Sequence, residues 1–362
     1  MTEAELIAQI PKRKIKSLIK SPEKSAEAVQ LVYVSDCAPG ITREKKGSSF
    51  EYWLNGKKIA EKGTLLRIKR LVIPPAWEKV WICNLDNGHL QVTGIDARGR
   101  KQYKYHSAWN ALRNHTKFYR LHQFGLALPG IRLKLEKDLS KSGLPLEKVL
   151  ATVVSLMERT NIRVGNEMYE KIYGSYGITT LKDKHVEISG THLKFSFKGK
   201  KGVLHDIKLK SKRLAGIVKK CRDIPGKELF QYYDESNNRK SIDSGMVNEY
   251  IRQISEGDFT AKDFRTWSGS VQGLIALKKL GSADSPTEIK RNIVAALDDV
   301  SQLLGNTRTV CRKYYVHPLV LTLYEQQSLD KYWRHLEEIE KDDGKAELTS
   351  EEKALMNILK NN

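Results

Sequence analysis

Four short segments of the sequence bring positively charged side chains together with tyrosines. Guanidinium and ammonium groups can stabilise the negative charge that develops on the oxygens of a phosphodiester under attack. A tyrosine hydroxyl can act as the attacking nucleophile and form a covalent intermediate. These residue types are compatible with phosphoryl transfer, but by themselves they do not identify the reaction. The segments are residues 163–166, 197–202, 260–267 and 304–318.

Each of these residues, taken singly, also has an ordinary structural explanation. Arg163 could be a surface ion-pair partner, Lys200 lies in a run of lysines, and Arg265 lies among mixed charges on a predicted helix. Tyr314 and Tyr315 could be core aromatics with a hydrated hydroxyl. Only the joint occurrence and the order of the four segments favour chemistry over structure.

Length and charge limit the classes of protein to consider. The chain has 362 residues, which at about 150 residues per domain predicts two or three domains. It carries 63 Lys and Arg against 43 Asp and Glu, a net charge of +20. A cationic surface gains free energy on a polyanion by releasing counterions, which makes nucleic acid the favoured partner. Solubility explains part of the excess, and charge alone names no activity.

Signals for membranes, export and metals are weak. No stretch approaches the ~20 apolar residues that span a bilayer, and the N-terminal residues lack the order of a signal peptide, which predicts an intracellular protein. Neither a Walker-type glycine loop nor a clustered Asp/Glu pair for two metals is present. The cysteines are far apart and the histidines lack metal-ligand spacing, so we expect no disulfide framework, metal or cofactor. The cysteines are Cys37, Cys83, Cys221 and Cys311, and the histidines nearest to a cluster are His185, His192 and His205.

Strand patterns precede helix patterns along the chain. Residues 31–110 read as short antiparallel strands, with turns at Asn55-Gly56 and Asp86-Asn87-Gly88. Beyond residue 110, apolar residues recur at helical spacing, except at residues 185–210, which alternate as a β-hairpin. We therefore expect an α+β fold, in which a small antiparallel β-sheet N-terminal domain precedes a mainly helical domain with a β-hairpin insertion.

The expected elements define four regions. These are a basic N-terminal arm at 1–30, a β-rich domain at 31–110, a mainly helical domain at 111–330, and a charged helical tail at 331–362. In the tail, Thr349 and Glu352 have the spacing of a capping box. The expected strands are 31–34, 50–54, 57–60, 80–83 and 89–94. The expected helices are 108–118, 120–126 and 131–139, broken at Pro129-Gly130, then 146–160, 211–221, 246–256, 261–280, 286–304 and 314–330.

The order of the four segments resembles that of the type IB DNA topoisomerases, particularly the short poxvirus-like enzymes of bacteria. The resemblance extends to the β-rich domain, where residues 72–77 (VIPPAW) and 93–106 (TGIDARGRKQYKYH) look like that family's N-terminal DNA clamp. It covers about residues 31–325 and therefore implies the family's fold for both domains. The matching order is Arg163, Lys200 in a β-turn, Lys262-x-x-Arg265, Gly305-Asn306-Thr307 and a tyrosine.

The resemblance assigns roles by position. It makes Tyr315, and not Tyr314, the nucleophile. It makes Arg163 and Arg265 the two catalytic arginines and Lys200 the general acid that protonates the leaving oxygen. Structural alternatives remain for three of the DNA-contacting positions, since the two tyrosines of the sheet could be a cross-strand aromatic pair and the lysine a solvated helix charge. The positions that it implies contact DNA are Gln102, Tyr103, Tyr105, Lys262 and Tyr169, the last in the same helix as the first arginine.

One catalytic position departs from the pattern of the poxvirus and eukaryotic enzymes. Asn306 stands where those enzymes carry histidine, whereas the bacterial branch looks similar to this sequence there. An asparagine amide can donate an N–H to a phosphate oxygen but cannot carry a charge. A role at Asn306 that requires an imidazolium is therefore in doubt, although the site as a whole is not expected to be inactive.

The resemblance implies a complete activity. The enzyme would cleave one strand of double-stranded DNA through a 3′-phosphotyrosyl intermediate and reseal it, relaxing positive and negative supercoils without ATP, metal or other cofactor. It would act as a monomer that clamps DNA between its two domains, in the cytoplasm at the nucleoid.

Two other functions compete with this interpretation. A tyrosine recombinase uses the same chemistry, but such enzymes usually show His-x-x-Arg where this chain has Lys262 to Arg265, and they lack the clamp domain. A basic, non-catalytic DNA-binding protein would explain the net charge, but not the combination of Arg163, Lys200, Arg265 and Tyr315.

Overall fold

The structure, a computed structural model, describes residues 18, 21–47, 49–97, 99, 101–234, 236–333 and 346–361. The chain forms two compact units, and their boundary falls between Arg120 and Leu121, inside helix α5 (Ser107–Leu139). We call them the sheet unit and the helical unit. Most of the predicted basic arm, residues 1–17 and 19–20, lies outside the described residues, as does part of the predicted tail, residues 334–345.

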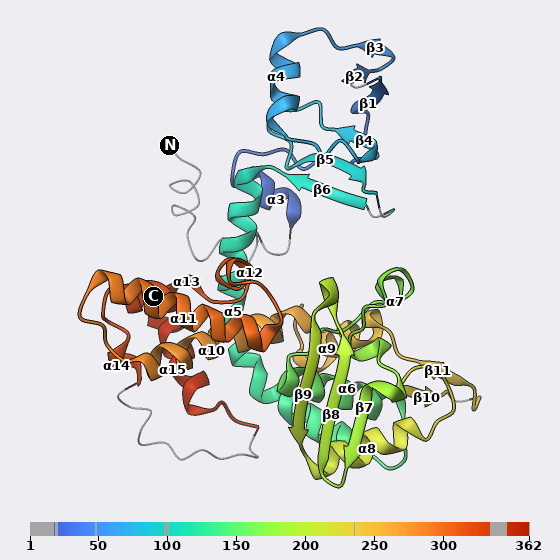
Figure 1. Ribbon diagram of the computed structural model, residues 1–362, viewed down its shortest axis with the longest axis vertical. Coiled ribbons are helices and arrows are strands. Elements are labelled where there is room, and N and C mark those ends of the chain that lie inside the picture. The colour runs from blue at the N-terminus through green and yellow to red at the C-terminus, as the bar shows by residue number, and fades with distance from the viewer. Residues whose placement is uncertain are drawn as a thin grey trace. The chain divides into compact units, whose positions relative to one another are not determined.

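The sheet unit is built on one six-stranded antiparallel sheet in the order β3-β2-β1-β4-β5-β6 (Figure 1). Helix α4 (Lys62–Arg70), which the sequence pattern did not predict, packs on the sheet through Ile68. Ile68 shares a buried cluster with Ile41 and Ile82, so the helix covers apolar side chains of the central strands. The strands are β1 (Ile41–Lys46), β2 (Ser49–Leu54), β3 (Lys57–Lys58), β4 (Glu78–Ile82), β5 (Leu90–Ile95) and β6 (Lys101–Tyr105).

One predicted turn is confirmed and one predicted strand is wrong. Asn55 and Gly56 join β2 to β3 with φ of 48° and 75°, the left-handed conformation that a two-residue hairpin needs. Among the described residues, 31–34 form a single bridge, from Val32 to Gly88. The neighbouring Leu31 packs instead with Trp109, in a cluster that also holds helix α3 (Pro22–Glu27).

Helix α5 is one helix of 33 residues where the sequence pattern predicted three. Pro129 lies inside it, although a proline removes one backbone hydrogen bond and crowds the preceding turn. Leu128 and Ile131 on either side of it are 1% and 0% exposed in the core of the helical unit. Tertiary packing therefore outweighs the local preference for a break.

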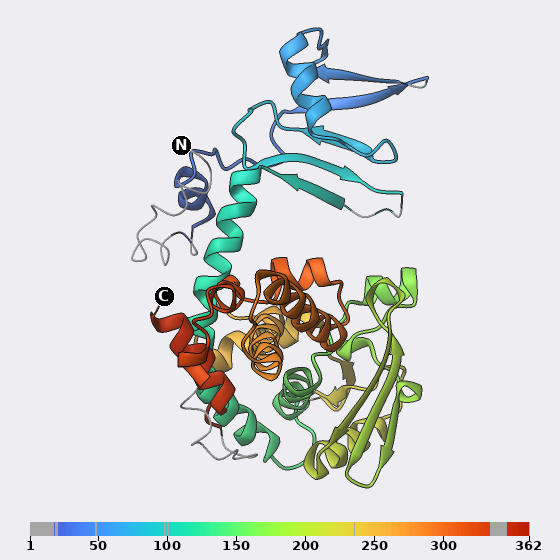
Figure 2. The ribbon, with the colours of Figure 1, turned by 60° about the vertical axis from the view of Figure 1, so that its left-hand side comes forward.

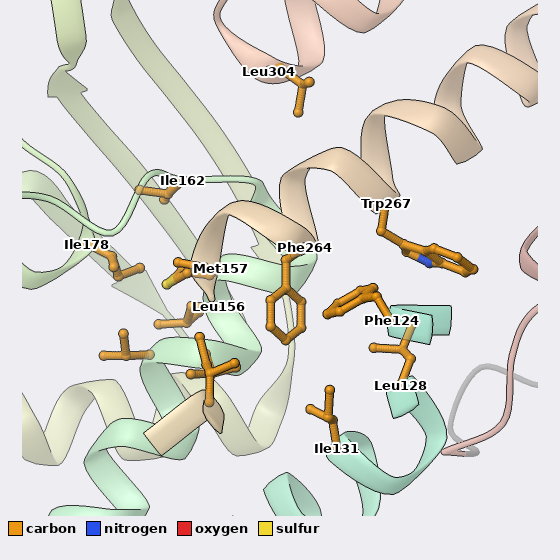
Figure 3. Packing of buried hydrophobic residues seen from close by; sticks show 14 of the residues in the cluster. Phe124, Leu128, Ile131, Leu156, Met157, Ile162, Ile178, Phe264, Trp267 and Leu304 are labelled. Carbon is orange, nitrogen blue, oxygen red and sulfur yellow. The ribbon is translucent and has the colours of Figure 1, made fainter. Parts of the chain in front are cut away.

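The helical unit contains helices around one extended apolar core. Helix α6 is buried along most of its length, and α10 packs against it. Phe124 of α5 meets Phe264 of α10 edge to face at 5.0 Å, and Trp267 lies 5.9 Å away (Figure 3). These contacts hold α10, which carries Arg265, in place. The helices are α6 (Leu146–Thr160), α7 (Glu167–Tyr173), α8 (Lys212–Arg222), α9 (Ser244–Ser255), α10 (Ala261–Leu280), α11 (Pro286–Leu304), α12 (Arg308–Tyr314), α13 (Pro318–Glu325), α14 (Asp330–Trp333) and α15 (Ser350–Asn361).

The predicted hairpin insertion is present, with one further strand. Strands β7 (Val186–Ser189), β8 (His192–Lys198) and β9 (Leu204–Lys210) form an antiparallel sheet along one side of the helical unit (Figure 2). Leu193, Phe195 and Phe197 point into the core, as their alternation predicted. A short pair, β10 (Gln231–Tyr233) and β11 (Arg239–Ser241), follows. The α+β fold class is confirmed.

The prediction of one continuous helix at 314–330 is wrong, because the helical conformation is interrupted immediately after Tyr314. Helix α12 ends there, and α13 begins at Pro318. Proline disfavours a helical conformation at the residue before it, and His317 is extended, with Nδ1 accepting a hydrogen bond from Leu319 N at 3.1 Å. Tyr315 therefore lies at a helix end, with irregular backbone on its C-terminal side.

The C-terminal helix α15 packs on α10 and is tied to the core by a buried carboxylate. The capping box is confirmed, since Thr349 N donates to Glu352 Oε2 at 2.9 Å and Glu352 N donates to Thr349 Oγ1 at 3.3 Å. Glu352 also accepts hydrogen bonds from Arg132 at 2.8 and 3.0 Å and from Trp267 Nε1 at 2.9 Å. Burial opposes the charge of Arg132, but Glu158 and Glu352 outweigh it and raise its pKa.

We expect Glu352→Ala to lower the free energy of unfolding of the helical unit by about 3 kcal/mol, because it leaves Trp267 Nε1 without an acceptor and removes one of the two carboxylates that pair with the partly buried Arg132. Urea unfolding followed by fluorescence measures the change. Glu347→Ala is the matched control, because its exposed side chain carries the same charge in the same segment. Equal stability of the two variants would contradict a stabilising role for this network.

No helix in the described part of the chain is long and apolar enough to cross a membrane.

Candidate active site

Arg163 lies in a loop between α6 and α7 whose ends are both capped. Asn161 ends α6 in the left-handed conformation, with φ of 56°, and Asn166 caps α7 by accepting from the backbone N–H of Met168. The placement of Tyr169 in the same helix as Arg163 is therefore wrong, since Tyr169 lies in α7 and Arg163 precedes it.

The Arg163 loop is fastened to the segment that follows α7. Ile178 N donates to Arg163 O, and Thr179 N donates to Val164 O, each at 2.8 Å. Gly165 and Gly177 let the two backbones touch, since a Cβ at Gly177 would lie 2.5 Å from Gly165 Cα. The main chain that carries Arg163 is therefore held on both sides.

Arg265 is buried, with 5% of its surface exposed, and connects two helix ends. Its guanidinium donates to Asn161 O, at the end of α6, and at 2.8 Å to Leu304 O, at the end of α11. Helix carbonyls at these positions have no partner within their own helix, so the charge satisfies them. Burial lowers the pKa of Arg265, which nevertheless remains positively charged at neutral pH.

Arg163 and Asn306, which are far apart in the sequence, are in direct contact. Arg163 Nη2 donates to Asn306 Oδ1 at 2.6 Å and to Gly305 O at 3.0 Å. Burial and the neighbouring Arg265 lower the pKa of Arg163 to about 10. Two guanidinium groups thus share one partly buried site, an arrangement that favours the arrival of an anion.

Tyr315 belongs to this site, whereas Tyr314 contacts a different cation. The guanidinium carbon of Arg265 lies 5.3 Å from the centre of the Tyr315 ring, while Lys313 lies over the Tyr314 ring. Ser270 Oγ is 3.1 Å from Tyr315 O, to which it can donate. Gly269 allows the close approach, since a Cβ there would lie 2.9 Å from Tyr315 O. Helix α10 therefore supplies both Arg265 and the support of the Tyr315 backbone.

Two polar groups of the site are buried without a partner. Arg265 Nε and Asn306 Nδ2 make no hydrogen bond to any described part of the protein. Buried donors are rarely left unsatisfied, so such groups point to an acceptor supplied by a ligand. Both are N–H groups, as binding of a phosphate oxygen requires.

Lys200 lies on the turn between β8 and β9. Its side chain is exposed, and Nζ is 5.8 Å from the centre of the Tyr169 ring of α7. Lys262 is also exposed, three residues before Arg265 on α10. The structure thus places Lys200 next to Tyr169, and Lys262 on the helix of Arg265.

The remaining predicted residues lie on β6 of the sheet unit. Tyr103 and Tyr105 are 48% and 39% exposed, and their rings stack 6.1 Å apart at 7°. The two rings stack along strand β6 and are not a cross-strand pair, because the cross-strand partners on β5 are Thr93 for Tyr103 and Leu90 for Tyr105. Both line a cavity of about 870 Å³ with basic side chains of the same unit, including Arg67, Arg70 and Lys104.

Gln102 is held within the sheet unit. Its Nε2 donates to Asp96 Oδ2 at 2.9 Å, and its side chain is half-buried. The side-chain amide of Gln102 therefore bonds to a residue of the same unit, and Gln102 lies on the strand that carries the stacked tyrosines.

His205 is a residue of the site that sequence reasoning missed. It stands opposite Phe197 in the β8–β9 pair, with the two rings stacked 4.9 Å apart. Its pKa is lowered by burial and by the positive charges of Arg163 and Arg265. The sequence offered no metal-ligand spacing around His205, and the alternation of β9 could have shown only which side of the sheet it occupies.

In the described residues, no group of three or more His, Cys, Asp or Glu side chains could hold a metal ion, and the four cysteines are free. Cys311 is buried near the two arginines of the site. Burial raises its pKa to about 11, so the thiol is not poised to react as a thiolate.

Two models of known protein families match this chain. A family model described as eukaryotic DNA topoisomerase I, catalytic core, matches residues 106–343, which include every residue of the site. The chain belongs to the type IB DNA topoisomerases. A second model, bacterial DNA topoisomerase IB, N-terminal domain, matches residues 49–96 of the sheet unit. The protein is therefore a DNA topoisomerase of type IB, and its substrate is DNA.

Curated relatives agree with this assignment. The DNA topoisomerase 1B of Acanthamoeba polyphaga mimivirus is 32% identical over 295 residues, covering 79% of this chain and 88% of the viral protein. The DNA topoisomerase 1B of Vaccinia virus (strain Copenhagen) is 26% identical over 243 residues, covering 65% and 72%. The DNA topoisomerase 1 of Mycosarcoma maydis is 24% identical over 295 residues, covering 74% of this chain and 28% of that protein.

Proposed function

We propose that this topoisomerase relaxes positive and negative supercoils without ATP or metal, by cleaving one DNA strand through a 3′-phosphotyrosyl intermediate and resealing it. One observation chiefly supports the proposal. Arg265 Nε and Asn306 Nδ2 are buried donors without partners in the described protein, in a site that also holds Arg163 and Tyr315. A phosphodiester offers the oxygen acceptors that these donors lack.

In the proposed cleavage step, Tyr315 Oη attacks the phosphorus and its proton leaves to water. The bond between phosphorus and the 5′ oxygen breaks as the tyrosyl bond forms. Arg163 and Arg265 stabilise the charge on the non-bridging oxygens, and Asn306 adds a neutral donor. Because the new bond is again a phosphodiester, attack by the 5′-hydroxyl reverses the step without an energy source.

The leaving 5′ oxygen needs a proton, and we assign its delivery to Lys200. A positioned general acid typically contributes 10²- to 10⁴-fold to the rate. Lys200 is exposed on the β8–β9 turn, so its ammonium group can follow the DNA when the substrate binds. Catalytic hydrogen bonds often tighten only in the complex with substrate.

DNA contacts are proposed for five further side chains. Tyr169 and Lys262 are exposed beside the site, and Tyr103 and Tyr105 are exposed on the sheet unit, where Gln102 is half-buried. Tyrosine hydroxyls, amides and lysines bind phosphate and sugar without reading sequence. We propose a monomer that acts on double-stranded DNA of any sequence and works at the nucleoid. Family membership argues against the recombinase and the non-catalytic alternatives.

The direct test is relaxation of plasmid DNA with EDTA present and ATP omitted. Both positively and negatively supercoiled plasmids are expected to relax, and denaturant added during the reaction should leave protein attached to 3′ ends. A requirement for magnesium or ATP, or attachment to 5′ ends, would contradict the proposed mechanism. Tight DNA binding without relaxation would make Asn306 the first residue to examine.

A further inference from the structure

The imidazole of His205 fills a narrow space between two glycines that lie far apart in the sequence. A Cβ at Gly199 would lie 2.6 Å from both Cδ2 and Nε2 of His205, and a Cβ at Gly305 would lie 2.7 Å from Cε1. These distances are shorter than any normal van der Waals contact. The ring is therefore pressed against both backbones, and only glycine at each position leaves room for it.

The two glycines belong to the two turns that carry proposed catalytic groups. Gly199 immediately precedes Lys200 on the β8–β9 turn, and Gly305 immediately precedes Asn306 at the end of α11. The β9 strand fixes His205 between them, because its ring stacks on Phe197 of β8 at an angle of 22°. The imidazole is thus the side chain that joins the hairpin turn to the α11 turn.

We propose that His205 is a positioning residue, a flat wedge that holds the Lys200 turn at a set distance from the Asn306 turn. The inference rests on the proposed function, because it matters only if Lys200 and Asn306 act on one phosphodiester. The wedge requires a planar ring between the two turns and needs no proton transfer.

The electrostatics of the pocket are consistent with a neutral ring. Burial and the charges of Arg163 and Arg265 lower the pKa of His205, so the imidazole is uncharged at neutral pH. An uncharged wedge adds no repulsion to the two guanidinium groups.

The test measures the single-turnover rate of DNA cleavage by the full chain, on a duplex with one cleavage site whose cleaved strand cannot be resealed. We expect His205→Ala to slow cleavage by roughly tenfold to a hundredfold, the range that small misplacements of reacting groups produce. DNA affinity and the thermal unfolding midpoint should stay close to those of the wild type. His205→Phe, a flat and uncharged ring, should restore most of the rate. His192→Ala, an exposed histidine on the same sheet, is the matched control.

A double-mutant cycle tests the wedge directly. Gly199 has φ of −92°, which alanine can adopt, so Gly199→Ala is obstructed by the His205 ring and not by its own backbone. We expect Gly199→Ala to slow cleavage by itself. In the double variant with His205→Ala the space is free. The combined loss of cleavage rate should therefore be clearly smaller than the product of the two single losses.

Three results would overturn the inference. They are a wild-type rate for His205→Ala, a His205→Phe variant as slow as His205→Ala, and independent losses in the double-mutant cycle. The second would show that the polar atoms of the imidazole matter. Failure of the proposed function is distinguishable, since the wild-type protein itself would then form no covalent complex with DNA.

Discussion

Tyr315→Phe is expected to abolish DNA cleavage and supercoil relaxation while leaving DNA binding intact. The change removes one oxygen, so the ring can keep its place 5.3 Å from the Arg265 guanidinium. Without the hydroxyl no phosphotyrosyl bond can form, and the rate should fall on the order of 10⁴-fold or more, as when other catalytic nucleophiles are removed. Plasmid relaxation, covalent trapping with denaturant and an electrophoretic binding assay measure the three quantities.

Tyr314→Phe is the matched control for this experiment. The neighbouring tyrosine lies at the end of α12 with Lys313 over its ring, and its hydroxyl has no proposed role in the chemistry. We expect relaxation by Tyr314→Phe to be near that of the wild type. A Tyr315→Phe protein that still relaxes plasmids would refute the assignment of the nucleophile, and inactivity of Tyr314→Phe alone would transfer the role to Tyr314.

Lys200→Ala should slow cleavage by about 10²- to 10⁴-fold, the contribution expected of a general acid, with little loss of DNA affinity. The physical reason is that the 5′ oxygen is a poor leaving group unless it is protonated. A duplex with a better leaving group at the scissile position, such as a 5′ sulfur, does not need that proton. The loss of rate should therefore largely disappear on this modified duplex.

Lys198→Ala provides the control for charge, because Lys198 is an exposed lysine on the same hairpin. Lys198→Ala should change the cleavage rate of the unmodified duplex and that of the sulfur-containing duplex equally, and by a small factor. If the sulfur-containing duplex fails to rescue Lys200→Ala, Lys200 is not the general acid and would act on the phosphate charge instead. If Lys198→Ala behaves like Lys200→Ala, the effect belongs to the net charge of the hairpin.

Local sequence predicted most of the scaffold but failed where tertiary contacts override local preference. Helices α10 and α11 begin and end at the residues that the sequence pattern predicted, and the Asn55-Gly56 hairpin formed. Helix α5 continues through Pro129 because its flanking residues are buried. The break after Tyr314 was missed, although Pro318 is a local signal for it.

For the site, the sequence by itself determined the residue types, their order and, through the resemblance, the family that the comparisons confirmed. Only the tertiary structure decided that Arg163 contacts Asn306 across 143 positions, that Arg265 is buried between two helix ends, and that the His205 ring separates Gly199 from Gly305. Periodicity reports which face of an element is apolar, but it carries no information on which distant segment packs there. Close packing of the core makes that choice, and the contacts that define the site follow from it.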